Sequence, residues 1–314
     1  MNDDFVRNII SGLQKEEKRI ASKYLYDEKG SLLFQEIMDQ PEYYLTKAEW
    51  SIFKAKASAI VELLVSRQSN GLQLMELGAG DGRKTALLLN ALDQLGVPTQ
   101  YEPVDIDKAV LNQLTDRLKS KYRDIQILPR AGYNEDALTK VAKDKKTVIL
   151  FLGSNIGNYS KPEETALMQR IAGAMKKGDS LLLGADRAKD PKLISRAYND
   201  RNGKTAEFNL NLIRRINQSW DAHLDIDAFQ FYAYYHPRKR EVHAFLVTNR
   251  DQRLALPNKS GSIHLPAWTY IQTEISRKYR LMDLEEMGKN VGLKLDTSWV
   301  DPNHYFFELL YTKK

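Results

Sequence analysis

The sequence of 314 residues contains no cysteine. A chain without cysteine has no disulfide bonds, no thiolate metal ligands and no cysteine nucleophile. Its few histidines show no spacing that is typical of a metal site; they are His223, His236, His243, His264 and His304. We therefore expect no bound metal.

Long uncharged apolar runs are also missing, although 42% of the residues are hydrophobic. No segment approaches the roughly 20 apolar residues of a membrane-spanning helix. The first residues, MNDDFVRNIISGLQKEEKR, lack the apolar core of a signal peptide. These absences predict a cytoplasmic protein that does not associate with membranes.

The basic residues are not clustered, although the formal net charge is +6. They are mixed with acidic residues, as in KEEKR and KVAKDKK. Such mixing is typical of a solvated surface, whereas nucleic-acid binding favours a basic patch with interleaved aromatic residues. We expect no nucleic-acid partner.

Short apolar runs alternate with helical patterns in the middle of the chain. The runs are LQLMEL (72–77), YEPVDI (101–106), IQIL (125–128), TVILFLG (147–153) and DSLLLGAD (179–186). The last two runs are nearly all apolar, which is typical of strands that are buried on both faces of a parallel sheet. The alternation predicts a doubly wound α/β core.

The segments on either side of this core have a different pattern. Helical spacing dominates from about Phe5 to Leu64, and two further strands are predicted around the Pro237 turn in FQFYAYYHPRKREVHAFLVTN. The final segment, HYFFELLYTKK, is predicted to return to the sheet edge as a strand. We predict a core of residues 60–195 plus 286–314, and a lobe of residues 1–59 plus 196–285 that covers the open sheet.

The most informative motif is a glycine-rich loop, Glu76-Leu77-Gly78-Ala79-Gly80-Asp81-Gly82, between a predicted strand and a predicted helix. Glycines allow a tight turn and a close approach of the backbone to a ligand. Arg83 stands where both a Walker loop and a dinucleotide-binding loop require glycine. The remaining pattern, acidic-x-Gly-x-Gly-x-Gly, resembles the S-adenosylmethionine (SAM) loop of class I methyltransferases. A plain glycine turn is the alternative.

Two further residues are candidate cofactor contacts. Asp105 ends the second predicted strand, where a carboxylate can accept two hydrogen bonds from ribose hydroxyls. Asp107 is better placed to cap the next helix. Lys84 either pairs with the carboxylate of bound SAM or is an exposed helix lysine.

Several segments together resemble the family of histidine Nα-methyltransferases of ergothioneine biosynthesis. They are YLYDEKGSLLFQEI, PEYYLTKAE, MELGAGDGRKT, PVDID, FLGSNIGN, LLLGADRAKDP, RAYNDRNGKTAEFNLNLI and IQTEISRKY, and they follow in family order across nearly the whole chain. The resemblance implies a class I SAM-dependent methyltransferase with a Rossmann-like core and an inserted α+β substrate-binding domain. The implied reaction is trimethylation of the α-amino group of L-histidine, which gives hercynine.

The resemblance also implies a role for individual residues. Asn158 and Tyr198 match residues that hold the substrate carboxylate, and Glu274 and Ser276 match the pair that binds the imidazole. The other implied substrate contacts are Tyr43 near the amine, where it orients the substrate for catalysis, and the smaller residues Gly153 and Thr205. The implied cofactor contacts are Tyr26, Gly78, Gly80, Lys84, Asp105 and Tyr133.

The residue types are compatible with these roles. An amide and a phenol can both donate to a carboxylate. Glu274 and Ser276 are two residues apart, so both point the same way in an extended segment. The alternatives are purely structural roles: Glu274 would pair with Arg277 or Lys278 on the surface, and Thr273 and Ser276 would cap a helix.

Two departures from the family pattern bear on specificity. Ala244 stands where the family usually has a methionine against the substrate ring, and Tyr133 stands where an acidic residue near the adenine is usual. The sequence therefore leaves alternatives to histidine: another amino acid such as tryptophan, or a histidine derivative. A nucleic-acid methyltransferase or RNA-binding module is the alternative of a different class. We expect a monomer.

Overall fold

The structure is a computed structural model that describes residues 3–66, 71–139, 141, 146–220, 222–257 and 261–314. The chain forms two compact units. The first unit comprises residues 1–43 and 190–277, and the second comprises residues 44–189 and 278–314. These boundaries differ from the predicted domains mainly because a long helix, α3 (Tyr44–Val65), packs against the sheet of the second unit.

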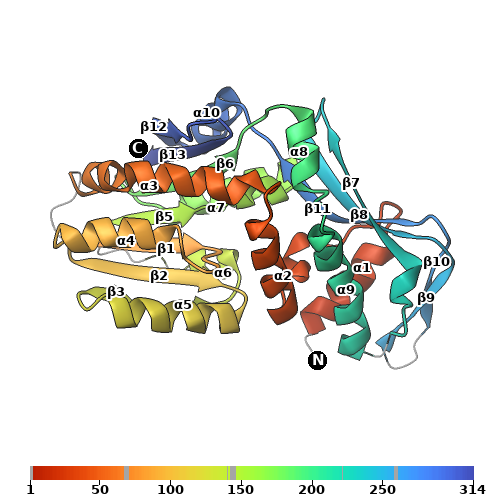
Figure 1. Cartoon of the computed structure of the whole chain (residues 1–314). Coiled ribbons are helices and arrows are strands. Elements are labelled where there is room, and N and C mark those ends of the chain that lie inside the picture. Colours follow the sequence, from red (N-terminus) through yellow and green to blue (C-terminus); the bar gives the residue numbers. More distant parts are fainter. Residues whose placement is uncertain (1–2, 67–70, 140, 142–145, 221, 258–260) are drawn as a thin grey trace. The chain divides into compact units, whose positions relative to one another are not determined.

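The second unit is built around an eight-stranded sheet (Figure 1). The order is β12-β13-β6-β5-β1-β2-β3, and β4 also pairs with β2. The strands are β1 (Leu72–Leu77), β2 (Thr99–Asp105), β3 (Ile125–Ile127), β4 (Arg130–Ala131), β5 (Thr147–Phe151), β6 (Ser180–Asp186), β12 (Leu293–Val300) and β13 (Phe306–Lys313). All five predicted core strands are present, and they pair in parallel.

Helices cover both faces of this sheet, and each face has its own hydrophobic core. One core joins the sheet to α3, α4 (Thr85–Gln94) and α5 (Lys108–Lys121). The other joins it to α6 (Asn134–Leu138), α7 (Lys161–Ala174) and α10 (Leu281–Asn290). The predicted doubly wound α/β core is confirmed.

The C-terminal strand does not lie at the sheet edge, and that prediction was wrong. β13 pairs antiparallel with β6 on one side and with β12 on the other. The strand β12 therefore forms the edge. Its partly exposed, polar sequence LKLDTSWV lacks the apolar run by which the buried strands were found.

One buried carboxylate, that of Asp186 at the end of β6, binds three residues at which the chain enters or leaves the second unit. The Tyr44 hydroxyl donates to Asp186 Oδ2 over 2.8 Å, and Lys278 Nζ lies 2.9 Å from the same oxygen. Lys189 pairs with the other oxygen. Residues 44, 189 and 278 are the points at which the chain enters or leaves this unit, so one side chain anchors all three.

The first unit combines helices with two small sheets (Figure 1). Its helices are α1 (Asp3–Gln14), α2 (Glu28–Asp39), α8 (Pro191–Ala197) and α9 (Lys204–Trp220), with short 3-10 turns at Ser22–Leu25 and Ile226–Ala228. A three-stranded antiparallel sheet has the order β11-β8-β7, formed by β11 (Tyr270–Arg277), β8 (Glu241–Thr248) and β7 (Phe229–His236). A hairpin pairs β9 (Gln252–Ala255) with β10 (Ser262–Leu265).

Among the described residues, no helix combines the length and the apolar character of a membrane-spanning segment.

Candidate active site

Most of the predicted cofactor residues, together with two predicted substrate residues, lie at the carboxyl edge of the parallel sheet, whereas Tyr26 belongs to the first unit. β1 lies between β2 and β5, so the strand order reverses there. Ligands of open α/β sheets bind at such a switch point. Gly78 follows β1, Asp105 ends β2, and Gly153 lies just beyond β5. Asn158 ends the short 3-10 turn Asn155–Asn158 behind Gly153.

The loop after β1 has the backbone that its glycines permit. Gly78, Gly80 and Gly82 have φ angles of 70°, 54° and 61°, a region that disfavours other residues. A Cβ atom at Gly80 would meet nothing within 4 Å, so open space borders the loop there. The Gly80 N–H donates to Asp105 Oδ2 over 2.9 Å. The structure thus joins two predicted cofactor contacts directly.

The two aspartates after β2 have different partners. Asp105 Oδ1 accepts from the Asp107 N–H over 2.9 Å, and burial raises the pKa of Asp105 above its usual value. Asp107 accepts from the N–H groups of Ala109 and Val110, which confirms it as the cap of α5.

Tyr133 lies close in sequence to the residues that pair with the end of β2. Ala131 pairs with Asp105, and the Gly132 N–H donates to the Asp105 carbonyl over 2.9 Å. Tyr133 then occupies the N-cap position of α6 and is half-buried. The chain therefore brings Tyr133 to the same edge as Asp105, and its contact with the adenine stays a prediction.

Lys84 is not the exposed helix lysine that the sequence left open. Its ammonium pairs with Glu49, a fully buried residue of α3. Although burial would lower it, the charge of Glu49 raises the pKa of Lys84 above its ordinary value. Glu49 ends the PEYYLTKAE segment, but the sequence analysis missed its role because it lies 35 residues before Lys84 and no motif links the two.

Asn155 is a second residue that sequence analysis missed. Its Nδ2 atom lies 3.4 Å from an ideal Cβ position on Gly78 and 3.5 Å from that on Gly153. It also donates to the Leu152 carbonyl over 2.9 Å. Asn155 therefore lies between the two glycine turns that border the switch point. The only sequence signal was its place in the GSNIGN segment.

Glu76 begins the glycine motif but is turned into the core. It accepts a hydrogen bond of 2.7 Å from the Thr85 hydroxyl and another from the Tyr101 hydroxyl. Burial raises its pKa from 4.5 to about 7, against the opposing effect of these hydrogen bonds. Glu76 thus joins the start of the glycine loop to Thr85 and Tyr101, and its carboxyl group takes up a proton as the pH falls through about 7.

This raised pKa predicts a pH-dependent stability. Between pH 4.5 and about 7 the folded chain binds more protons at Glu76 than the unfolded chain does. The contribution of Glu76 to the unfolding free energy is therefore present in full below pH 4.5 and is lost as pH rises through 7. Glu76→Gln lacks this loss, so the stability of wild type relative to the variant should fall by up to about 3 kcal/mol over this window. Urea unfolding of both proteins at several pH values tests this, and parallel pH profiles would contradict it.

The first unit brings two predicted substrate residues into contact. The Tyr198 hydroxyl donates to Ser276 Oγ over 2.7 Å, and both side chains are buried. Tyr198 directly follows α8, and Ser276 lies on β11. The sequence separation of 78 residues gave no hint of this bond beyond the family resemblance.

Glu274 lies on the same face of β11 as Ser276, because the two residues are separated by one position. In the register of the sheet, Glu274 pairs with Ala244, which pairs with Ala233. Directly paired residues have side chains on one face. Two small side chains therefore lie in the same row as the carboxylate of Glu274.

Of the structural alternatives for this segment, helix capping was wrong. Thr273 and Ser276 belong to a strand, so neither caps a helix. Arg277 pairs with Glu241 over 2.6 Å, and Lys278 pairs with Asp186. Each of the two cations that were candidate partners of Glu274 thus has another acidic partner.

The AYND segment has a structural role beside Tyr198. Asp200 accepts from the N–H groups of Lys204 and Thr205 over 2.7 and 2.8 Å, which starts α9. Although partial burial would raise the pKa of Asp200, the hydrogen bonds from Thr205 and Lys204 hold it below its usual value. Thr205 is therefore fixed at the first turn of α9, where it is buried.

Tyr26 and Tyr43 belong to one aromatic cluster of the first unit. The Phe34 ring lies edge-on to both, with centroid distances of 5.4 Å to Tyr26 and 6.1 Å to Tyr43. Phe208 of α9 contacts Tyr26 and Phe34. The sequence predicted the two tyrosines and missed the two phenylalanines, whose spacing is that of ordinary helix core.

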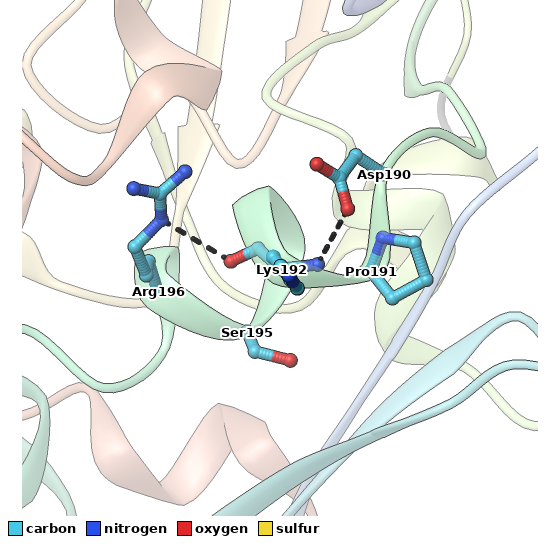
Figure 2. A pocket seen from close by; sticks show the side chains of 5 residues that line it. All are labelled: Asp190, Pro191, Lys192, Ser195 and Arg196. Carbon is cyan, nitrogen blue, oxygen red and sulfur yellow. Dashed lines mark hydrogen bonds between the residues drawn. The ribbon is translucent and has the colours of Figure 1, made fainter.

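A shallow recess at the start of α8 contains none of the predicted site residues (Figure 2). Asp190 accepts from the Lys192 N–H over 2.9 Å, and Arg196 Nε donates to the Lys192 carbonyl over 3.3 Å. These bonds cap and brace a seven-residue helix. We assign no function to this recess. In the described parts of the chain, no group of three or more His, Asp or Glu side chains could hold a metal ion.

Comparison with known proteins identifies the family. A family model described as histidine-specific, SAM-dependent methyltransferase matches residues 5–313. The chain belongs to this family. It is 34% identical to histidine N-alpha-methyltransferase of Mycobacterium tuberculosis, over 94% of this chain and 90% of that protein. The Mycolicibacterium smegmatis protein of the same name is 30% identical over 94% and 91%. An L-tryptophan methyltransferase of Psilocybe serbica is 26% identical over 93% and 88%.

The chain is therefore a SAM-dependent N-methyltransferase of the histidine-specific family, with the predicted Rossmann-like fold and an additional antiparallel sheet. The carboxyl edge of the second unit fits the cofactor. It offers the free space beside Gly80, the carboxylate of Asp105 and the cation of Lys84. The space beside Gly80 lets a nucleoside approach the backbone closely. The carboxylate of Asp105 can accept hydrogen bonds from the two ribose hydroxyls, and the cation of Lys84 can pair with the carboxylate of the methionine part of SAM.

Proposed function

We propose that this enzyme methylates the α-amino group of L-histidine three times and releases hercynine. The observation that carries the proposal is the arrangement on β11. Glu274 and Ser276 lie on one face of the strand, and Ser276 is bound to Tyr198. A carboxylate and a hydroxyl on one face can bind the two ring nitrogens of an imidazole. The histidine-specific family and its 34% identical member support the same substrate.

The roles of the other residues follow the family resemblance. Asn158 and Tyr198 would bind the substrate carboxylate, and Tyr43 would orient the amine, with Gly153 and Thr205 as smaller contacts. Tyr26, Gly78, Gly80, Lys84, Asp105 and Tyr133 would hold the cofactor.

The chemistry asks little of the protein beyond positioning. SAM supplies a methyl group that is already electrophilic. The protein has to bind a neutral amine in line with the donor bond, and such orientation lowers the barrier by several kcal/mol, on the order of 7 or more. The amine proton is lost to solvent or to a nearby oxygen. Aromatic faces such as that of Tyr43 suit the quaternary ammonium that forms after three transfers.

A substrate screen tests the proposal directly. The protein is incubated with SAM and each free amino acid, and the products are followed by mass spectrometry. We expect L-histidine to gain three methyl groups and the other amino acids to remain unmodified. Unmodified histidine together with methylation of another amino acid would reject the substrate assignment while leaving the reaction class intact.

One observation favours a second candidate, an aromatic amino acid larger than histidine. Ala244 and Ala233 lie in the row of Glu274, and both are small. The resemblance implies a methionine at the place of Ala244. A wider site would suit an indole, and a relative is named an L-tryptophan methyltransferase.

Replacing Ala244 by methionine tests whether this residue borders the substrate and limits its size. The larger side chain should fill space beside Glu274, so the ratio of kcat/KM for histidine to that for tryptophan should rise about tenfold or more. Phe245→Met is the matched control, because Phe245 is the next residue and its side chain lies on the opposite face of β8. Steady-state kinetics with both amino acids give the ratio. An unchanged ratio in Ala244→Met would remove Ala244 from the substrate site.

A further inference from the structure

Two buried carboxylates lie together over β6, and the methyl-transfer chemistry uses neither. Glu49 comes from α3 and Glu308 from β13, and both are fully buried. A Cβ atom on Gly184 would overlap with Glu49 Oε1 and lie 2.9 Å from Glu308 Oε1. The absence of a side chain at Gly184 therefore leaves room for both carboxylates beside this strand.

Glu49 is bound to two predicted site residues at once. Its Oε1 atom accepts from the Gly153 N–H over 2.6 Å, and its Oε2 atom pairs with Lys84 Nζ. Gly153 follows β5, and Lys84 precedes α4 after the glycine loop of β1. One carboxylate therefore ties together the two segments that flank the switch point of the sheet.

We propose that Glu49 is a positioning residue for SAM, which acts by fixing the ammonium of Lys84 and the turn at Gly153. The inference rests on the proposed function in one respect, the assignment of Lys84 as a cofactor contact. A lysine side chain has many rotamers, and holding it in one reduces the entropy that is lost when a ligand binds. Glu49 supplies this restraint from a fully buried position.

Glu308 has none of these contacts, although it is equally buried and lies against the same glycine. Burial, followed by the charge of the nearby Glu49, raises the pKa of Glu308 well above its usual value. The raised pKa favours the uncharged form of the acid, and a glutamine is close to that form in shape and charge. Glu308→Gln is consequently a matched control for Glu49→Gln.

Calorimetric titration with S-adenosylhomocysteine, the demethylated product of SAM, measures the effect without any amino-acid substrate. We expect Glu49→Gln to raise the Kd for this probe about tenfold or more. Glu308→Gln should bind the probe as wild type does. Equal Kd values for wild type and Glu49→Gln, or equal losses in both glutamine variants, would overturn the proposal. Failure of histidine methylation would not affect this readout.

A double-mutant cycle separates positioning from a purely structural role. If Glu49 acts through Lys84, then Glu49→Gln should add little to the loss already caused by Lys84→Met, and the double variant should bind the probe like Lys84→Met alone. Losses that multiply would contradict the proposal. Glu49→Gln leaves the charge of Lys84 without its partner, and this variant could fail to fold for that reason alone. The double variant lacks both charges, so the comparison with Lys84→Met still gives a result.

Discussion

Replacing Glu274 by alanine is expected to lower kcat/KM for L-histidine by at least about 100-fold. Glu274 lies on the same face of β11 as Ser276, and the Ser276 hydroxyl is already bound to Tyr198. Without the carboxylate, a ring nitrogen of bound histidine would be desolvated without a partner, which is costly. The affinity for S-adenosylhomocysteine should stay within about twofold of wild type, because none of the proposed cofactor contacts lies on β11.

Glu241 provides the matched control for this prediction. It lies on the neighbouring strand β8 and pairs with Arg277 and His243, and its side chain is on the opposite face from that of Ala244 and Glu274. Glu241→Ala should lower stability and leave the KM for histidine unchanged. Steady-state kinetics and thermal unfolding of both variants measure the two effects. Equal losses of histidine turnover in the two variants would assign Glu274 a folding role.

Replacing Asp105 by alanine is expected to raise the Kd for S-adenosylhomocysteine at least about 100-fold. Two effects combine in this variant. The proposed acceptor for the ribose hydroxyls is lost, and the Gly80 N–H loses the oxygen that holds the glycine loop. Asp105→Asn keeps one acceptor oxygen and should bind with intermediate affinity. Calorimetric titration measures all three proteins.

Asp107 is the natural comparison, since it has the same side chain two residues later. Its carboxylate caps α5 through Ala109 and Val110. Asp107→Ala should therefore cost about 1 kcal/mol of stability and leave the Kd for the probe unchanged. A cofactor affinity that falls equally in Asp105→Ala and Asp107→Ala would show that the end of β2 is a structural element only.

The core of the fold could be predicted because its strands carry a local signal. β1 and β6 are short, mostly apolar runs, and they are buried along their whole length. β12 carries no such signal, since it is a polar edge strand that pairs only with β13. Helical spacing was visible in the segment that contains α3, but the place of this helix in the second unit depends on its packing against α4 and β13.

The candidate site was predictable where a motif is contiguous and was missed where it is assembled. Gly78, Gly80 and Asp105 stand in short motifs with known chemistry, and the structure joins Gly80 to Asp105. The contacts of Glu49 span 35 residues to Lys84 and 104 residues to Gly153. No pattern in the sequence specifies such pairs, because they exist only once α3 lies on the sheet.

The position of the transferred methyl groups is the most direct test of the proposed function. L-histidine is incubated with SAM that carries ¹³C in its methyl group, and the product is examined by two-dimensional NMR. We predict one labelled signal from three equivalent methyl groups on the α-nitrogen, with the imidazole unmodified. Labelled methyl groups on a ring nitrogen, or no label on histidine, would contradict the account.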